Sequence, residues 1–344
     1  MLWRQADYYG DFRCKGGDCR NSCCEGWEIA VGMEDYFRLI ALECGDELHH
    51  KIECAFRTPQ SPSPERYRLI SPNWLGMCPL HDEGGLCMLH RDCGAGALPE
   101  ICRVYPRSLK RLCGQGRACC SNSCEAVIEA LMRDAPLSFP SAPLDARPEL
   151  DEGGDPAALT LGWACISLIQ DRSLALDARV GKVCSLLNRG ARARRNPGAE
   201  DGLRALMSAL EALRPEFRSL DAFGAAAFER YTGTGALERH RADMAALRAR
   251  FPKLDLWMEN VLANHFFYAG FPAVDARLEP ADACPGLCLL YSGALAAAAA
   301  HCALHPGRDA LADALAGFFR MAEHSAFYYN ARVLLREPAA LLAI

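Results

Sequence analysis

The second half of the chain carries apolar residues at helical spacing. From residue 157 onward, Ala and Leu recur every three to four positions among Arg and other polar residues, which is the period of an amphipathic helix. Proline residues fall between these stretches, where helix breakers belong. The pattern predicts helices over Ala157–Leu168, Leu174–Leu187, Gly202–Leu213, Leu220–Tyr231, Leu237–Arg250, Leu254–Tyr268, Gly286–Cys302 and Arg308–Met321, and a last helix reaching Leu335.

The first 135 residues follow a different pattern. Gly and Pro are frequent and no period is sustained, so only short helices are expected there, at Glu34–Glu43 and Ser123–Met132. Between residues 134 and 156, seven Gly or Pro residues indicate a linker. We therefore predict a mainly α protein with an irregular, cysteine-rich, metal-binding domain over residues 1–135, a linker over 136–156 and a helical bundle domain over 157–344.

The cysteines are concentrated in the first domain. Of 19 cysteines, 14 lie between Cys14 and Cys124. Such a concentration is typical either of disulfides in small secreted domains or of metal ligands in intracellular proteins. This chain is long enough to bury a core without disulfides, its start has no signal-peptide pattern, and its cysteine count is odd. We therefore expect a cytoplasmic protein that binds metal through thiolates.

Charge and hydropathy exclude two other classes of partner. The net charge is −5, so there is no basic footprint for nucleic acid. No run of about 18 apolar residues is visible, since the Ala-rich stretch Ala294–Ala300 is short and is followed by His301. We expect neither a nucleic-acid partner nor a membrane span.

Close cysteine spacings let several thiolates reach one centre, and three groups have them: Cys14-x4-Cys19-x3-Cys23-Cys24, then Cys78-x8-Cys87-x5-Cys93-x8-Cys102, then Cys113 with Cys119-Cys120-x3-Cys124. Zinc sites often use paired CxxC units, and the chain has none. An all-cysteine set with irregular spacing suits an iron–sulfur cluster at least as well. Zinc stays the alternative metal.

The ordered set of motifs resembles the flagellin lysine N-methylase family, and more widely the cysteine-cluster proteins that chelate zinc or iron. The motifs are Phe12-x-Cys14, Cys19-x3-Cys23-Cys24-x-Gly26-Trp27-x-Ile29, Cys78-Pro-Leu, Gly85-x-Cys87, Leu98-Pro-x-x-Cys102-x-x-Tyr105-Pro106-Arg107 and Ser123-Cys124-Glu125. A less specific similarity covers Trp257 to Pro272. The resemblance implies a [4Fe–4S] cluster, S-adenosylmethionine as methyl donor, and methylation of lysine side chains on a protein, with flagellin as the family precedent.

The metal role implied by the resemblance carries onto eight cysteines. Five match best, and three follow: Cys19, Cys23, Cys24, Cys87 and Cys102, then Cys14, Cys78 and Cys124. A [4Fe–4S] cluster needs four ligands, so the surplus is open. The Cys-x3-Cys-x2-Cys triplet of radical S-adenosylmethionine enzymes is absent. A nucleotide-binding GxGxxG loop is not found either, because the segments beginning at Gly94 and Gly233 both lack its last glycine.

Methyl transfer would need a deprotonated lysine, because an ammonium group has no lone pair to attack the methyl carbon. Tyr105 is the candidate catalytic residue, with the alternative that it only anchors the turn after Cys102. Trp27 is expected to pack over the cluster and exclude water. Arg107 would neutralise an anionic cluster or bind a carboxylate, unless it is simply exposed. Two non-enzymatic alternatives stay open, a zinc- or iron-binding module and an electron-transfer iron–sulfur protein.

Overall fold

The computed structural model describes residues 2–144, 153, 155–188, 198–214 and 227–344. It divides into two compact units, and the first is discontinuous in sequence. Unit 1 comprises Met1–Phe12 and Arg107–Ile344, and unit 2 comprises Arg13–Pro106. Unit 2 is thus an insertion between the N-terminal strand of unit 1 and the rest of that unit. The predicted domain boundaries at residues 136–156 stay a prediction.

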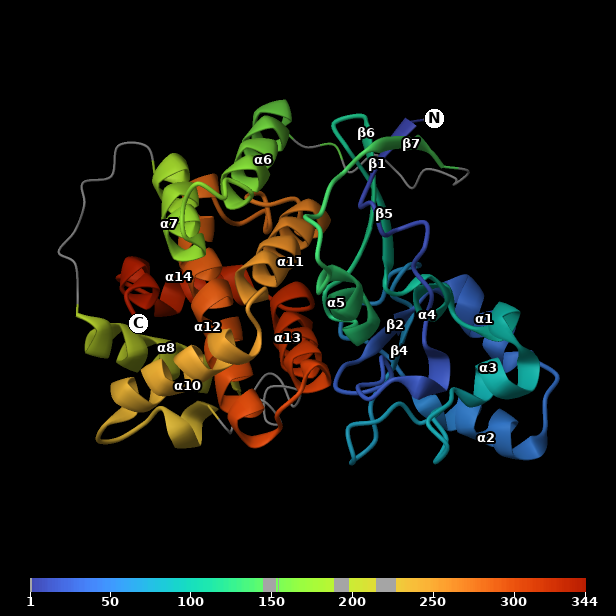
Figure 1. Cartoon of the computed structure of the whole chain (residues 1–344). Helices are drawn as coiled ribbons and strands as arrows, with labels where there is room; N and C mark the ends of the chain where they lie inside the picture. The colour runs from blue at the N-terminus through green and yellow to red at the C-terminus, as the bar shows by residue number, and fades with distance from the viewer. Residues whose placement is uncertain (1, 145–152, 154, 189–197, 215–226) are drawn as a thin grey trace. The chain divides into compact units, whose positions relative to one another are not determined.

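The described part of unit 1 contains a sheet with the strand order β5–β6–β1–β7 (Figure 1). Strand β1 (Leu2–Gln5) runs parallel to β6 (Gln115–Cys120) and antiparallel to β7 (Ser141–Pro143). Strands β5 (Arg107–Leu112) and β6 form a hairpin. Its turn residues Cys113 and Gly114 both have positive φ, 49° and 76°, as a two-residue hairpin turn of type I′ requires. Strand β7 lies within the stretch predicted to be a linker.

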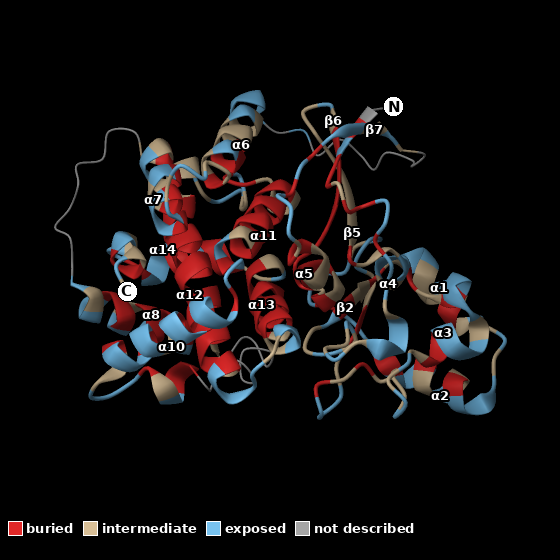
Figure 2. Cartoon of the chain, viewed as in Figure 1, coloured by how far each residue is buried: buried red, intermediate tan, exposed pale blue. Residues whose placement is uncertain are grey.

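Helices make up most of unit 1, and the prediction of a mainly α protein is confirmed. Their periodic apolar faces lie inside, as the sequence pattern indicated (Figure 2). The predicted helix Leu220–Tyr231 falls largely outside the described residues. The described helices are α5 (Glu125–Leu131), α6 (Pro156–Ile169), α7 (Leu176–Leu187), α8 (Ala199–Leu213), α10 (Ala236–Arg250), α11 (Leu254–Ala269), α12 (Ala283–Leu304), α13 (Arg308–Glu323) and α14 (Phe327–Leu334), with 3-10 turns η4 (Pro280–Asp282) and η5 (Pro338–Leu342).

Helix α12 is the central element of the unit 1 core. It contacts α7, α8, α10, α13 and α14, and nearly all its side chains are buried (Figure 2). Over Pro280–Leu304 the mean hydropathy reaches 1.7 in an 18-residue window, so the helix is long and apolar enough to cross a membrane, yet 83% of that window is buried inside the protein. The expectation that no such run exists was therefore wrong, because the apolar residues begin well before the Ala-rich stretch.

Unit 2 has more regular structure than the irregular domain we predicted. Its described strands form a small antiparallel sheet in the order β2–β4–β3. Strands of two or three residues are too short to show a period in sequence, which explains why they were missed. The elements are η1 (Gly16–Asp18), β2 (Ile29–Val31), α1 (Met33–Ile40), α2 (Asp46–Ala55), β3 (Phe56–Arg57), β4 (Arg68–Ile70), α3 (Met88–Cys93), η2 (Ala95–Ala97) and α4 (Glu100–Val104).

Candidate metal centre

Two loop segments of unit 2 pair with each other and bring Cys24 next to Cys78. The Cys78 amide donates to the Cys24 carbonyl at 2.7 Å, and the Gly26 amide donates to the Gly76 carbonyl at 2.9 Å. Gly26 and Gly76 both have positive φ, 89° and 85°, a conformation that residues with a Cβ rarely adopt. The glycines therefore permit the turns that join these two cysteines from distant parts of the sequence.

A tight hairpin then returns the chain so that Cys87 lies near Cys78. His81 and Cys87 form an isolated antiparallel bridge, and the His81 amide donates to the Cys78 carbonyl at 3.0 Å. At the tip, the Asp82 carboxylate accepts a hydrogen bond from the Leu86 amide at 2.9 Å. Backbone pairing, rather than sequence spacing alone, thus fixes the positions of these two cysteines.

Cys102 comes from the short helix α4, which a carboxylate of α1 holds in place. Asp35 accepts a hydrogen bond from the Glu100 amide at 2.6 Å, so a negative charge lies at the amide end of α4, where it is stabilising. Arg38 donates to the carbonyls of residues 96, 97 and 98 at 2.8–3.1 Å. The loop before α4 and the start of α4 are therefore both tied to α1.

The four thiols of these segments lie near one another. Cys24, Cys78, Cys87 and Cys102 all pack against the apolar core of unit 2 or belong to it. If ionised, each of the four would repel the other three, so all pairs are close enough to interact electrostatically. The structure therefore gathers these four predicted ligands into one place, and Cys23 adjoins them through its contact with Cys24.

Burial is the main reason why Cys78, Cys87 and Cys102 resist ionisation. It raises the pKa of Cys78 to about 12, and repulsion from Cys24 and Cys87 acts in the same direction. Burial also raises the pKa of Cys87 and of Cys102, again with repulsion from the other thiolates. At neutral pH, with no cation near, these groups are therefore thiols. A metal ligand must be a thiolate, so metal binding at this place would release protons.

Of the remaining predicted ligands, Cys23 contacts the group of four, and the others have different surroundings. Cys14 is exposed and its sulfur accepts a hydrogen bond from the Gly16 amide at 3.4 Å. A hydrogen bond with Cys24 is the main cause that raises the pKa of Cys23, with repulsion from Cys102 and Cys14 adding to it. Cys19 is half-buried and follows η1. Cys124 belongs to unit 1, where it is the residue preceding α5.

The four cysteines have the number and type of donor atoms that an iron–sulfur cluster needs, but their arrangement in space is a separate requirement. Four cysteines match an iron–sulfur cluster in number and type. Among the described residues, however, no group of three or more Cys, His, Asp or Glu side chains is arranged to hold a metal ion. The metal-binding role of these cysteines therefore stays a prediction.

Trp27 and Tyr105 meet beside this group of thiols. Their ring centroids are 5.8 Å apart in an edge-to-face arrangement, a favourable geometry for aromatic pairs. Trp27 packs against the same apolar core as Cys24, Cys87 and Cys102. Two residues selected from the sequence for their chemistry are therefore in contact, and the role of Trp27 over a cluster stays a prediction.

Arg107 is engaged within unit 1. Its guanidinium donates to the Phe12 carbonyl at 3.1 Å and lies over the Phe12 ring, 5.0 Å from the centroid. These contacts join the last residue before the insertion to the first residue after it. The predicted role of Arg107 in cofactor binding stays a prediction, and the contacts observed are structural.

A buried polar network in unit 1 was not recognised from the sequence. The His265 Nδ1 lies 2.8 Å from the Glu323 carboxylate, and its Nε2 lies 2.9 Å from the Tyr328 hydroxyl. The other oxygen of Glu323 accepts from the Ser121 hydroxyl at 2.5 Å. The side chains of His265 and Glu323 are 1% and 0% exposed. The sequence did contain a signal for this network, namely polar residues within otherwise apolar helical stretches. Such residues are buried with the helix and need hydrogen-bond partners there.

Over about a third of its length, the chain is similar to curated proteins named as lysine methylases. It is 27% identical over 131 residues to the Lysine-N-methylase of Salmonella choleraesuis (strain SC-B67) and 28% identical over 124 residues to that of Salmonella typhimurium (strain LT2). It is 25% identical over 131 residues to the Flagellar biosynthetic protein FliU of Salmonella muenchen. The family relationship suggested by the cysteine motifs is thereby supported.

These similarities are partial. Each match covers 36% of this chain, and it covers 30% of the two methylases and 72% of the FliU protein. The chain thus spans less than a third of the length of the two methylases in these matches. No protein-family model matches the chain. No solved structure matches it either.

Proposed function

We propose that the protein is an S-adenosylmethionine-dependent lysine N-methyltransferase that acts on a protein substrate and carries a [4Fe–4S] cluster. The observation that carries the proposal is the gathering of four mutually close cysteines in unit 2. The similarity to proteins named as lysine methylases adds the reaction class. We place the protein in the cytoplasm, where thiols stay reduced.

In this proposal the cluster ligands are Cys24, Cys78, Cys87 and Cys102. Their number equals the number of thiolates that hold such a cluster, and they derive from three separate segments of one unit. Burial lowers the local dielectric, so it disfavours the free thiolates and strengthens their attraction to a cation. Once bound, the cluster would supply a Lewis-acidic and redox-active centre. Cys14, Cys19, Cys23 and Cys124 are then thiols outside the ligand set.

The aromatic pair Trp27–Tyr105 has a definite task in this arrangement. In this proposal the Trp27 indole would shield the bound cluster from water, which would strengthen the charge interactions at the cluster. The Tyr105 hydroxyl is the group we assign to the substrate amine. After the lysine has released its proton to solvent, the hydroxyl oxygen would accept a hydrogen bond from the neutral amine and orient its lone pair for attack. The substrate is a protein, with a flagellin-like protein as the first candidate, given the name of the FliU relative.

The test is methyl transfer by anaerobically purified full-length protein. S-adenosylmethionine with a radioactive methyl group is incubated with the protein and with flagellin, and label incorporated into lysine is measured after acid hydrolysis. We expect incorporation that depends on the protein, and a Tyr105→Phe variant that retains metal with a lower rate. Iron and labile sulfide are measured on the same preparation.

Distinct results would refute distinct parts of the proposal. A preparation with zinc and no sulfide would refute the cluster and favour a zinc-binding module. A loaded cluster without any binding of S-adenosylmethionine would refute the methyltransferase and favour electron transfer. Equal rates for Tyr105→Phe and the unmodified protein would remove Tyr105 from the reaction.

A further inference from the structure

Three cysteines of unit 1 lie together in its core, outside the candidate metal centre. Cys184 is in the last turn of α7, and Cys284 and Cys288 lie one helical turn apart on α12. Helix α7 packs against α12, so the three thiols meet where these two helices touch. The Cys184 and Cys288 sulfurs are 3.7 Å apart, which is direct contact. We call these three residues the thiol trio.

Asn188 fixes the position of one member of the trio. Its side-chain amide donates to the Cys284 sulfur at 3.1 Å and to the Cys184 carbonyl at 3.0 Å. The Cys284 thiol in turn donates to the Cys184 carbonyl at 3.7 Å. Cys284 is thus held by polar contacts on two sides. Cys288 has its sulfur against that of Cys184, so it is the better placed of the two to bond with Cys184.

Burial differs among the three members. Cys284 and Cys288 are 2% and 1% exposed, whereas Cys184 is half-buried. A hydrogen bond with the Cys284 thiol lowers the pKa of Cys184, but its contact with Cys288 and its burial raise that pKa, and the net direction is upward. Only a thiolate is a nucleophile, so Cys184 reacts slowly at neutral pH. It is nevertheless the member that a reagent in solution reaches first.

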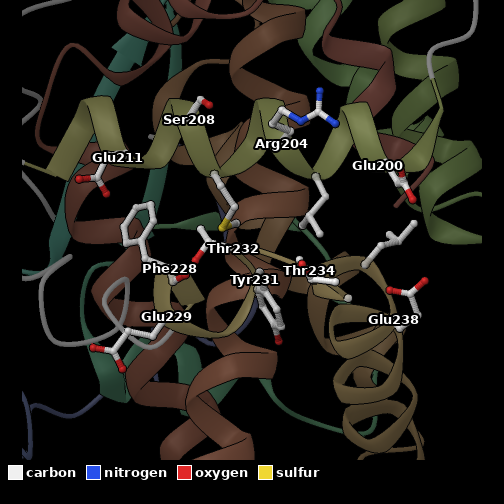
Figure 3. Close-up of a pocket in the computed structure, with 16 residues that line it drawn as sticks. Glu200, Arg204, Ser208, Glu211, Phe228, Glu229, Tyr231, Thr232, Thr234 and Glu238 are labelled. Carbon is white, nitrogen blue, oxygen red and sulfur yellow. Dashed lines mark hydrogen bonds between the residues drawn. The ribbon is translucent and has the colours of Figure 1, made fainter.

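The trio is separate from the cavity of unit 1 that Figure 3 shows. That cavity, of about 820 Å³, lies between α8 and the segment from Phe228 to Glu238, and the described residues that line it include no cysteine. A reagent therefore reaches the trio at the half-buried Cys184 and not through this cavity. The reagent must also be small, because the other two sulfurs are buried.

We propose that Cys184 and Cys288 are a site of reversible oxidation, at which a hydroperoxide converts the two thiols into a disulfide that links α7 to α12. This inference does not rest on the proposed function. The two sulfurs must approach from 3.7 Å to about 2.05 Å, a change that rotation of the two side chains supplies. A disulfide is uncharged, so it suits a buried position better than a thiolate does. In a reducing compartment the trio stays in the thiol form, and the link forms only when peroxide is present.

The reaction has two steps, which balance in atoms and electrons. The Cys184 thiolate attacks one oxygen of the hydroperoxide, so that an S–O bond forms, the O–O bond breaks, and the leaving oxygen takes up the proton that the thiol had lost. The Cys288 sulfur then attacks the sulfur of the Cys184 sulfenic acid. The S–S bond forms, the S–O bond breaks, and water leaves with the Cys288 proton. The two thiols lose two electrons, and the hydroperoxide gains them.

Peptide mapping of the full-length protein tests this inference. The protein is treated with hydrogen peroxide at neutral pH, free thiols are alkylated, and tryptic peptides are analysed by tandem mass spectrometry. We expect the peptide that contains Cys184 to be linked to the peptide that contains both Cys284 and Cys288. Fragmentation should place the bond at Cys288, and dithiothreitol should remove it. This map of the unmodified protein does not depend on the folding of any variant.

Two variants separate this site from general oxidation. Cys302→Ala is the matched control for Cys288→Ala, because Cys302 is buried on the same helix and lies outside the trio. The linked peptide should fall at least about tenfold in Cys288→Ala and be unchanged in Cys302→Ala. Peroxide should also raise the urea midpoint of Cys302→Ala but not that of Cys288→Ala, because the link constrains the unfolded chain. Circular dichroism confirms the fold of both variants.

The inference would be overturned if Cys184 and Cys288 were both alkylated after a peroxide treatment that had oxidised other cysteines of the chain. A bond from Cys184 to Cys284 would also overturn it, as would further oxidation of Cys184 without any bond. Either result would show that the Cys288 thiol does not react with the Cys184 sulfenic acid.

Discussion

Replacing Glu323 by Ala is expected to destabilise unit 1 strongly. The Glu323 side chain has no exposed surface, and its two oxygens accept hydrogen bonds from His265 at 2.8 Å and Ser121 at 2.5 Å. Its removal leaves both of these groups buried without their acceptor. Breaking a buried charged network by removing one partner costs roughly 3–5 kcal/mol. We expect a loss of that order in the free energy of unfolding.

Urea unfolding followed by far-ultraviolet circular dichroism measures this loss. Glu323→Gln keeps the shape and can still accept a hydrogen bond, so it should lose roughly 1–3 kcal/mol. Glu337→Ala is the control, since Glu337 is exposed and surface substitutions usually cost less than about 0.5 kcal/mol. A loss below about 1 kcal/mol for Glu323→Ala would show that the network does not stabilise the fold, and the reasoning would fail.

Three further predictions follow from the core and the candidate metal centre. The proposed ligands are Cys24, Cys78, Cys87 and Cys102, and replacing any one of them by Ser should at least halve the iron and sulfide content of anaerobic preparations. Cys54→Ser is the control and should retain both. Equal loading of the ligand variants and the control would refute the ligand set. Burial lowers the pKa of His240 to about 4, so its protonation favours the unfolded state and stability falls by roughly 3 kcal/mol as pH drops from about 6.5 to about 4. His240→Phe should flatten the pH dependence of urea midpoints over that interval, and an unchanged slope would contradict this assignment. Gly162→Ala should cost roughly 1–3 kcal/mol in urea unfolding, because a Cβ there would lie 2.6 Å from the Phe271 carbonyl oxygen. Gly10→Ala meets open space and is the control, so an equal cost at both positions would argue against the steric explanation.

The helices of unit 1 could be predicted because they are long. Helix α11 begins at Leu254 in both the prediction and the structure, and α10 ends at Arg250 in both. The sheet could not be predicted in the same way. Strand β1 finds its parallel partner β6 only after the whole insertion, with Trp3 opposite Gly116. Such a pairing depends on contacts between distant residues, which a local period does not encode.

Only part of the candidate metal centre could be predicted from the sequence. Spacing and resemblance left eight cysteines as ligands, and the resemblance ranked Cys19 above Cys78. The backbone hydrogen bond between Cys24 and Cys78 places Cys78 in the group. The two cysteines are far apart in sequence and meet because the chain turns at Gly26 and Gly76.

The insertion of unit 2 into unit 1 has a consequence for chain entropy. Strand β1 must meet β6 across a segment that includes all of unit 2, Arg13–Pro106. Closing a flexible loop of roughly 100 residues costs roughly 4 kcal/mol. A folded unit 2 removes most of that cost, because its own contacts already restrict the inserted segment. The hydrogen bond from Arg107 to the Phe12 carbonyl then joins the two chain segments that flank the insertion. Substitutions that unfold unit 2 should therefore also loosen β1 in unit 1, even though they touch no residue of that sheet.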